Sequence, residues 1–139
     1  MISIQLKGLE SLRKKINPTV LNKIIEDEIE LAAFGAKGDA ISKCISTSVA
    51  ASINVEVKPQ SFILEATDKI APYIEFGTGG QVFQTSVFNF TPEMRQYAKR
   101  FYVNGEGRMS AHPFLFPSAF DNYKKMVKNV KNKVKELYK

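Results

Sequence analysis

Residues 73–80, YIEFGTGG, place one acidic side chain in a short apolar segment and follow it with a glycine-rich turn. Two chemistries need such residues: proton transfer by Glu75 and phosphate binding by the turn. Proton transfer would need a partner carboxylate, and no neighbouring residue is indicated for that role. A Walker loop needs Lys-Ser/Thr after its last glycine and a dinucleotide fingerprint needs G-x-G-x-x-G, and residues 77–80 match neither pattern. We therefore expect the Glu75 carboxylate to accept hydrogen bonds from backbone donors or to pair with a basic group.

The chain has one histidine, His112, and one cysteine, Cys44. These two residues are too few for a cysteine/histidine zinc cluster within one chain, and a lone cysteine forms no internal disulfide. His112 directly precedes Pro113, and no G-x-S-x-G or comparable nucleophile elbow accompanies it. We expect His112 to be a turn or packing residue and Cys44 to be a small buried apolar residue. The sequence therefore predicts no enzyme activity, no cofactor and no bound metal.

The positive charge of the chain is concentrated near its C-terminus. The net charge is +6, and residues 121–139 hold seven lysines and two acidic residues, so that the other 120 residues, with 13 basic and 12 acidic groups, are nearly neutral. A basic helix of this kind binds phosphates, faces an acidic protein or is simply solvated. Phe120 and Tyr123 fall on an apolar stripe and not between the lysines, so a base-stacking platform is not indicated. The candidates for a DNA-facing or partner-facing surface are Lys124, Lys128, Lys131 and Lys135.

The first half of the chain predicts a strand, a long helix and a hairpin. Residues 2–6 alternate apolar and polar side chains, which predicts a short edge strand. Apolar residues then recur every three or four positions, with Asn17 as N-cap, and predict a helix over about 18–47. Two interior glycines of this helix indicate either a close approach of another backbone or a kink. Residues 53–67 alternate again on either side of Pro59-Gln60, which predicts a β-hairpin with one apolar face.

The second half predicts a long irregular segment and a C-terminal helix. Residues 77–112 form an extended loop or arm with a short helix near 92–102, which starts at Thr91-Pro92-Glu93. Apolar residues spaced by three and four then mark an amphipathic helix: Phe120, Tyr123, Val127, Val130, Val134 and Leu137. Lysines beside this stripe would repel each other in a coiled coil, so we expect it to pack on the chain's own sheet and long helix.

Together these elements predict one α+β domain over residues 1–139. It would contain a small, mainly antiparallel sheet, with the long N-terminal helix and the C-terminal helix packed on one face. The N-terminus has no signal-peptide pattern, and no run approaches the roughly 18 apolar residues that span a bilayer. We expect a soluble, intracellular protein with no membrane partner.

Two short motifs bear a resemblance to a known family. YIEFGT over residues 73–78 and PFLFP over residues 113–117, followed by a lysine-rich amphipathic helix, resemble the small minor virion proteins of long-tailed bacteriophages. This family is typified by gene product ten of phage HK-ninety-seven, and its members are called neck or tail-completion proteins. In the family, an aromatic-x-Glu-Phe-Gly-Thr element ends a strand and a Pro-Phe-Leu-x-Pro element opens the last helix. The matching residues are Tyr73, Glu75, Phe76, Gly77, Thr78, Pro113, Phe114, Leu115 and Pro117.

Other parts of the chain agree less closely with the family. Residues 8–12, GLESL, are similar to the usual start of such proteins, before the long helix. Phe116 stands where the family often has a basic residue, and Ser118 stands where alanine is usual. Residues 81–108 form a long, aromatic insertion, which we expect to act as an arm onto a neighbouring subunit.

The resemblance implies a structural role without catalysis. The chain would be a subunit of a ring, expected to hold six copies, that joins the portal and connector of the DNA-filled head to the tail. Its partners would be other copies of itself, portal or connector proteins, tail proteins and, through the basic helix, packaged DNA. It would lie in the neck of the virion, and in the host cytoplasm during assembly. Residues 73–80 would be a structural corner, with Glu75 as an orienting or interface carboxylate.

Two alternatives to the joining role stay open. A tail-terminator or head-closure ring subunit occupies the same neck region. A basic nucleic-acid-binding module belongs to another class of function, and salt-sensitive DNA binding by the isolated chain would favour it.

Overall fold

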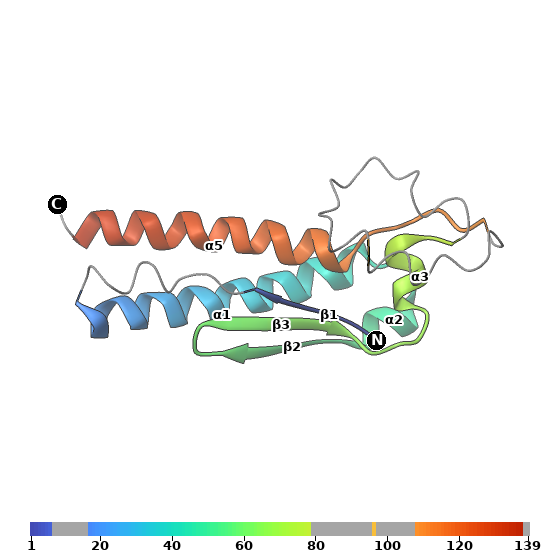
Figure 1. Cartoon of the computed structure of the whole chain (residues 1–139), viewed down its shortest axis with the longest axis horizontal. Coiled ribbons are helices and arrows are strands. Elements are labelled where there is room, and N and C mark those ends of the chain that lie inside the picture. The colour runs from blue at the N-terminus through green and yellow to red at the C-terminus, as the bar shows by residue number, and fades with distance from the viewer. Residues whose placement is uncertain (7–16, 79–95, 97–107, 138–139) are drawn as a thin grey trace.

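The computed structural model describes residues 1–6, 17–78, 96 and 108–137. The elements in chain order are β1 (Ile2–Leu6), α1 (Pro18–Lys43), α2 (Thr47–Ala51), β2 (Ile53–Lys58), β3 (Ser61–Ala66), α3 (Ala71–Phe76) and α5 (Leu115–Leu137). The α+β class is confirmed: helices pack on a small antiparallel sheet (Figure 1). Of the short helix expected near 92–102, only Gln96 is described, and it is helical. The rest of that helix, the GLESL segment and most of the aromatic insertion lie outside the described residues.

The sheet has the strand order β1-β3-β2, and both pairings are antiparallel. Leu64 of β3 is central, since it lies opposite Ile4 of β1 on one side and Val55 of β2 on the other. The edge strand and the hairpin are therefore confirmed. On the helix-facing side of the sheet, Val55 of β2 is half-buried against the core and Val57 near the hairpin turn is 42% exposed. The buried residues on this side are Ile2, Ile4, Ile53, Phe62, Leu64 and Ala66. Along β2, burial of this apolar face thus decreases from Ile53 toward the hairpin turn.

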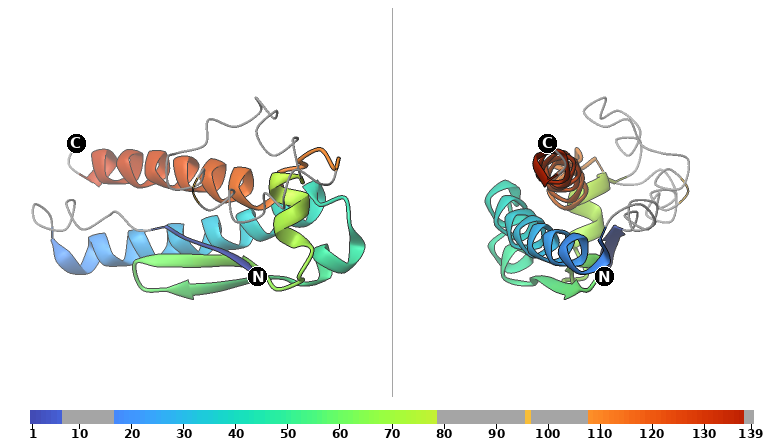
Figure 2. Two further views of the ribbon diagram at one scale, coloured as in Figure 1. Left: turned by 45° about the vertical axis from the view of Figure 1, so that its right-hand side comes forward. Right: turned by 90° about the vertical axis from the view of Figure 1, so that its left-hand side faces the viewer.

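The two long helices cover this one face of the sheet. α1 packs on β2 and β3, and α5 packs on α1 and reaches β1 and β3 (Figure 2). The two helices run in opposite directions along the sheet, as Figure 1 shows. Packing of the C-terminal helix on this chain's own sheet and long helix, as expected from the sequence, is therefore confirmed.

α1 ends at Lys43, about four residues earlier than the apolar spacing predicts. Cys44 takes an extended conformation, and the side chain of Ser46 accepts a hydrogen bond from the Val49 N–H and caps the separate helix α2. Serine is a preferred N-cap residue, so a new helix starts where the predicted one would have continued. Cys44 is half-buried at this joint, with its Sγ 3.4 Å from the Ser46 carbonyl oxygen. The expectation of a buried cysteine is therefore only partly met.

The buried side of α5 differs from the predicted apolar stripe. Val130 is the one stripe residue that is buried; four others are half-buried against the core and Leu137 is 52% exposed. The centre of the buried side consists of Leu115, Ser118, Ala119, Asn122, Met126 and Val130. A search for apolar periodicity misses this side because two of its members are polar residues with hydrogen-bond partners inside the protein. Ser118 Oγ donates to the Phe114 carbonyl at 2.6 Å, and Asn122 Nδ2 donates to the Ser118 carbonyl at 2.8 Å.

Partly buried polar contacts fix the register between α1 and α5. Asn122 Nδ2 also donates to Asp39 Oδ2 at 2.7 Å. Two turns further along α5, Asn129 Nδ2 donates to Glu28 Oε2 at 3.0 Å, and Lys133 Nζ lies 2.6 Å from Glu28 Oε1. Glu28 is 3% exposed. A carboxylate buried to this degree needs both a charge partner and hydrogen bonds, and α5 provides them only when the two helices are correctly aligned.

The two glycines inside α1 have different environments, which allows a matched test. A Cβ added at Gly35 would lie 2.5 Å from Asn122 Oδ1, whereas one added at Gly38 would have no neighbour within 4 Å. The close approach expected from the sequence therefore occurs at Gly35 only. We expect Gly35→Ala to lower the free energy of unfolding by about 1–3 kcal/mol, because Asn122 cannot move without breaking its hydrogen bonds.

The companion substitution Gly38→Ala should have the opposite sign. Alanine has the better helix propensity, so it should raise the free energy of unfolding by roughly 0.5–1 kcal/mol. Urea denaturation of both variants at low protein concentration checks the pair. Equal effects of the two substitutions would contradict the assigned packing.

Candidate functional site

The motif residues 73–76 lie in a short helix, α3, and not at the end of a strand. The expectation of a strand is therefore wrong. The chain turns at Asp68, whose Oδ1 accepts a hydrogen bond from the Ile70 N–H at 3.0 Å. Pro72 lies in the first turn of the helix, and Gly77 ends it at φ 77° with its N–H donated to the Tyr73 carbonyl at 2.8 Å. Proline near the start of a helix and glycine just after its end are typical helix boundaries. These two residues indicate α3 in the sequence, although the short apolar segment between them is equally typical of a strand.

The Glu75 carboxylate binds the N-terminus of α5. The side chain is 1% exposed. Its Oε2 accepts hydrogen bonds from the N–H groups of Phe114 at 2.8 Å and Leu115 at 2.9 Å, and its Oε1 accepts one from Phe116 at 2.9 Å. The next residue, Pro117, has no N–H. The first four backbone N–H groups of a helix have no acceptor inside the helix. Here one carboxylate accepts three of these hydrogen bonds, and the fourth position is a proline, which has no N–H.

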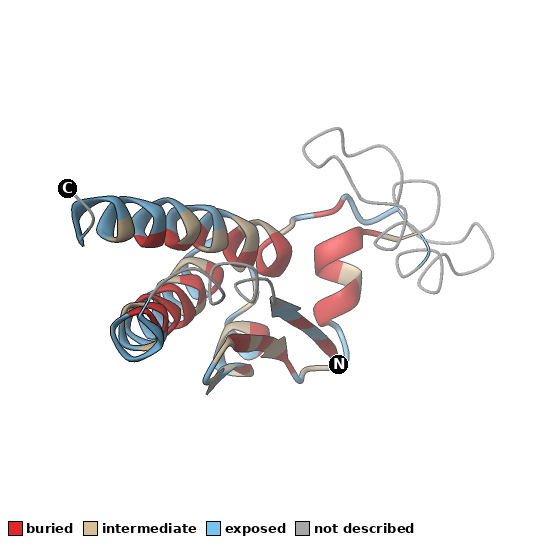
Figure 3. Ribbon diagram, turned by 60° about the vertical axis from the view of Figure 1, so that its left-hand side comes forward, coloured by how far each residue is buried: buried red, intermediate tan, exposed pale blue. Residues whose placement is uncertain are grey.

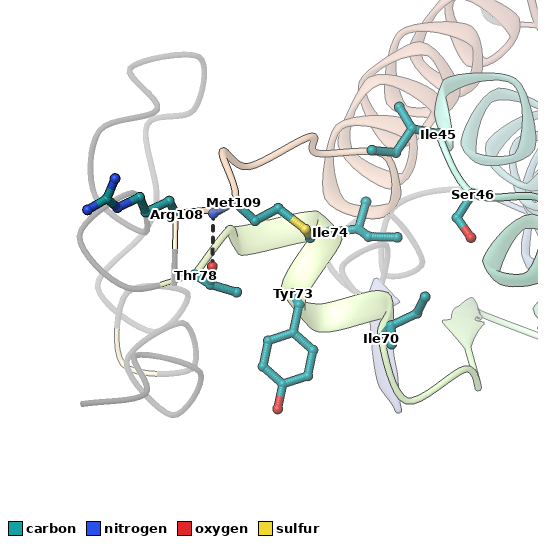
Figure 4. Close-up of a pocket in the computed structure, with 8 residues that line it drawn as sticks. All are labelled: Ile45, Ser46, Ile70, Tyr73, Ile74, Thr78, Arg108 and Met109. Carbon is teal, nitrogen blue, oxygen red and sulfur yellow. Dashed lines mark hydrogen bonds between the residues drawn. The ribbon is translucent and has the colours of Figure 1, made fainter. Parts of the chain in front are cut away.

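Further backbone contacts join the same two segments. The Thr78 N–H donates to the Met109 carbonyl at 2.9 Å, and the Met109 N–H donates to Thr78 Oγ1 at 3.0 Å (Figure 4). The His112 N–H donates to the Ile74 carbonyl at 2.7 Å. We call residues 74–78 with residues 109–117 the α3–α5 junction. Its two halves are separated by 30 residues of sequence but lie in direct contact.

Aromatic packing completes the α3–α5 junction. The rings of Phe76 and Phe116 lie 5.6 Å apart, and Phe116 stacks on Phe120 at 6.4 Å. Phe116 is buried, which accounts for an apolar residue at a position where the resembled family often has a basic one. Ser118, the other departure from the family, is buried as well and donates to the Phe114 carbonyl. Both departures therefore fit their surroundings in this chain.

Burial and hydrogen bonding act on Glu75 in opposite directions. The pKa of the carboxyl group is raised from 4.5 to about 7 as the net result: burial raises it, and the backbone N–H groups of Leu115, Phe114 and Phe116 and the charge of Lys43 lower it. The N-terminus of a helix also favours a negative charge. At neutral pH the group is therefore close to its titration midpoint, which makes the α3–α5 junction sensitive to pH.

We expect the contribution of Glu75 to stability to decrease as the pH rises from about 5 to about 8. The folded-state pKa of about 7 lies above the ordinary value of 4.5, so the folded chain binds more protons than the unfolded chain across this window. The loss should be about 3 kcal/mol over the window, at 1.36 kcal/mol per pKa unit. The measurement is urea denaturation against pH for the native chain and for Glu75→Gln, whose difference isolates this group. A difference of opposite slope would mean that the three N–H donors outweigh burial and keep the carboxylate ionised.

Of the residues in the two motifs, most meet in the α3–α5 junction. Glu75, Phe76, Phe114 and Leu115 are buried there, while Pro113, Pro117 and Thr78 are half-buried. Tyr73 is half-buried and is one of the residues that line a groove of about 480 Å³, together with Ile45, Ile70 and Met109 (Figure 4). The groove is predominantly apolar, with Arg108 at its edge. His112 lies within the α3–α5 junction, and its side chain is exposed and not packed in the core.

The four candidate lysines of α5 are separate from the α3–α5 junction. Lys124, Lys128, Lys131 and Lys135 are all exposed and lie along one side of the helix, opposite its buried side. None of them forms an ion pair with another described residue. Lys133, in contrast, is bound to Glu28, and this contact raises the pKa of its ammonium group. The surface defined by the four lysines is therefore a uniformly basic strip without internal charge partners in the described part of the chain.

Neither a metal site nor a membrane-spanning helix is found among the residues that the structure describes. Among residues 1–6, 17–78, 96 and 108–137, no group of three histidine, cysteine, aspartate or glutamate side chains is placed to hold a metal ion. No described helix combines the length and the apolar character that crossing a bilayer requires.

Comparison of the chain with protein-family models, with curated proteins and with solved structures found no match.

Proposed function

We propose that this chain is a structural subunit of the neck of a long-tailed bacteriophage, in a ring that joins the DNA-filled head to the tail. In this role it has no catalytic activity and needs no cofactor. Its partners are other copies of the chain, the portal or connector, and tail proteins. It acts in the virion, after synthesis and assembly in the host cytoplasm.

The observation that carries the proposal is the contact between Glu75 and the N-terminus of α5. The resemblance to neck proteins rests on two short motifs that are distant in sequence, and each motif alone is a weak signal. In the structure one motif supplies the carboxylate and the other supplies the three N–H donors. Two motifs that form one structural unit are better support for a common origin than two independent matches.

The same geometry supports an arm at this position. The described residues on either side of the aromatic insertion, Thr78 and Met109, are joined by two hydrogen bonds. The insertion therefore leaves and rejoins the body at one fixed place. A segment anchored at its base in this way is suited to contact a neighbouring subunit, and loops of this length in small domains are commonly functional.

The direct test is electron microscopy of lysates from a phage that carries a stop codon at Glu75 of this gene. Filled heads beside separate tails of normal length would support the joining role. Tails of uncontrolled length would instead favour the tail terminator, and heads that lose their DNA would favour head closure. Intact, infectious particles would contradict all three roles.

A charge-reversal variant tests the basic strip of α5. We expect Lys124→Glu, Lys128→Glu and Lys131→Glu together to reduce particle assembly or DNA retention at least tenfold, because they replace three exposed positive charges by negative ones. The three side chains have no described charge partners, so the folded chain should keep its stability within about 1 kcal/mol. Particle yield and packaged DNA are the measurements. Unchanged yield and retention would show that the strip is only a solvated surface.

A nucleic-acid-binding module is the alternative from another class, and the same basic strip favours it. Binding of DNA by the isolated chain, titrated over a range of salt concentrations, separates the two functions. A module that binds phosphates through the four lysines should lose affinity steeply with salt. Absence of DNA binding, together with ring formation in the presence of virion partners, would favour the neck role.

A further inference from the structure

α1 has a second apolar side, opposite the one that packs in the core. Its core side carries residues such as Leu21, Ile25 and Ala36, which are at most 2% exposed. On the outer side, Leu31 is 66% exposed and Phe34 is 57% exposed. α5 and the sheet leave this outer side uncovered (Figures 2 and 3). Large apolar side chains gathered on one exposed helix side are typical of an interaction surface.

The outer residues follow the spacing of a coiled-coil seam. The positions alternate in steps of three and four along the helix: Ile24, Asp27, Leu31, Phe34, Gly38 and Ile41. Ile41 is 42% exposed, and Ile24 is half-buried at the edge of the core. Steps of three and four keep one side of a helix toward a partner helix over its whole length. We call these six residues the outer seam.

We propose that the outer seam of α1 pairs with the outer seam of a second copy of this chain, with the two helices antiparallel about a two-fold axis. In the register that sets Leu31 against Phe34 of the second copy, Ile24 lies against Ile41 and Asp27 lies against Gly38. Every apolar residue of the outer seam then has an apolar partner. The one acidic residue lies opposite the one residue without a side chain, and a Cβ at Gly38 has no neighbour within 4 Å in the single chain, so there is space for the carboxylate.

Charges beside the outer seam favour the same register. Glu30 and Lys37 lie on one flank of it, and the antiparallel register brings Glu30 of each copy beside Lys37 of the other. The symmetry creates this pair twice. A parallel arrangement would place Asp27 against Asp27 and would leave the glutamate and the lysine apart. Like charges in contact across an interface oppose association, so the antiparallel arrangement is selected.

The proposed contact is small, and it is different from the contact that closes a ring. A two-helix contact over residues 24–41 is about 26 Å long at 1.5 Å per residue. It should bury on the order of 1,000 Å² in total, at the low end for specific interfaces, and we expect a dissociation constant in the micromolar range. A two-fold contact uses the same surface on both copies, whereas a cyclic ring of six uses two different surfaces. The dimer therefore does not depend on the proposed neck function.

Sedimentation equilibrium of the full chain from about 1 µM to about 300 µM brackets such an affinity. The expected result is a reversible monomer–dimer equilibrium that the double variant Leu31→Glu with Phe34→Glu abolishes. Both side chains are exposed in the single chain, so circular dichroism and denaturation of this variant should match the native chain. Val57→Glu, which adds a charge at an exposed apolar residue of β2, is the control and should leave the equilibrium unchanged.

Charge exchange tests the register itself. Glu30→Lys alone or Lys37→Glu alone should raise the dissociation constant about tenfold at low salt, because each creates two like-charge contacts. The combined variant should restore the native value to within about a factor of three. Three results would overturn the proposal: a monomer at all concentrations, a dimer that survives Leu31→Glu with Phe34→Glu, or unfolding of that variant as a monomer, which would mean that the chain itself covers the outer seam. Failure of the exchange to restore binding would overturn the antiparallel register.

Discussion

Glu75→Ala should be among the most destabilising single substitutions in this chain, with a loss of about 4 kcal/mol or more in the free energy of unfolding. The substitution removes the acceptor of three backbone N–H groups at the start of α5. Phe114 and Leu115 are fully buried and Phe116 nearly so, so water cannot easily replace the carboxylate. Each buried donor left without a partner costs about 1–3 kcal/mol. Urea denaturation, monitored by circular dichroism, is the measurement.

Glu75→Gln separates the hydrogen bonds from the shape of the side chain. The amide keeps one oxygen, which can accept from two of the donors, but its NH₂ group must then face the third N–H. We expect a loss of about 1–3 kcal/mol, smaller than that of alanine. Glu56→Ala is the matched control, because Glu56 is an exposed carboxylate on β2, and its effect should stay within about 0.5 kcal/mol. Equal, small effects of all three substitutions would show that Glu75 does not hold α5.

The parts of the fold that could be predicted from sequence are those set by local patterns. The alternation of apolar and polar side chains predicts the hairpin, because successive side chains of a strand point to opposite faces of the sheet and only one face is buried. The N-cap at Asn17 marks the start of α1, and its side chain accepts the Thr19 N–H at 3.2 Å. The end of α1 differs from the prediction because Ser46 caps a new helix, although the apolar pattern continues beyond Lys43. In α3, six residues are too few for a helical period to be recognised, although Pro72 and Gly77 mark its two ends.

The candidate site shows a different limit. The sequence indicated either backbone hydrogen bonds or a basic partner for Glu75, and the structure shows the backbone hydrogen bonds. It could not indicate which donors, because they lie 39 to 41 residues away along the chain. Asn122 and Ser118 were missed for a related reason: their burial depends on partners that only the tertiary structure supplies. The sequence also does not distinguish the outer seam of α1 from its core side, because both sides carry apolar residues and only the tertiary structure shows which one is buried.

The α3–α5 junction links these local and distant contacts into one unit. Gly77 ends α3 in a conformation that turns the chain toward Met109, and the same turn leaves Glu75 directed at the start of α5. The position of the basic helix, and that of the residues that flank the aromatic insertion, Thr78 and Met109, therefore depend on one short segment. In the proposed neck role, a change there would displace both the arm and the basic strip without altering either surface.

Gly77→Ala tests this dependence and should lower the free energy of unfolding by about 3 kcal/mol or more. Gly77 has φ 77° and ψ −175°, a region that essentially only glycine occupies. An added Cβ would also lie 2.7 Å from the Met109 carbonyl oxygen and 2.9 Å from the Ala111 nitrogen. Both neighbours are backbone atoms, so the clash can be relieved only by moving residues 109–111 away from α3. The contacts of Thr78 with Met109 should then weaken first.

The measurement is urea denaturation together with hydrogen exchange of the Met109 and His112 amides, which donate to Thr78 and Ile74. We expect Gly77→Ala to accelerate exchange at these two amides, relative to the native chain, more than at the amides of β3. Gly38→Ala is the matched control, because it adds the same methyl group to a glycine with free space around it. A Gly77→Ala variant as stable as the native chain would mean that the turn tolerates a side chain. The close contact between α3 and residues 109–111, on which the role of the α3–α5 junction rests, would then be wrong.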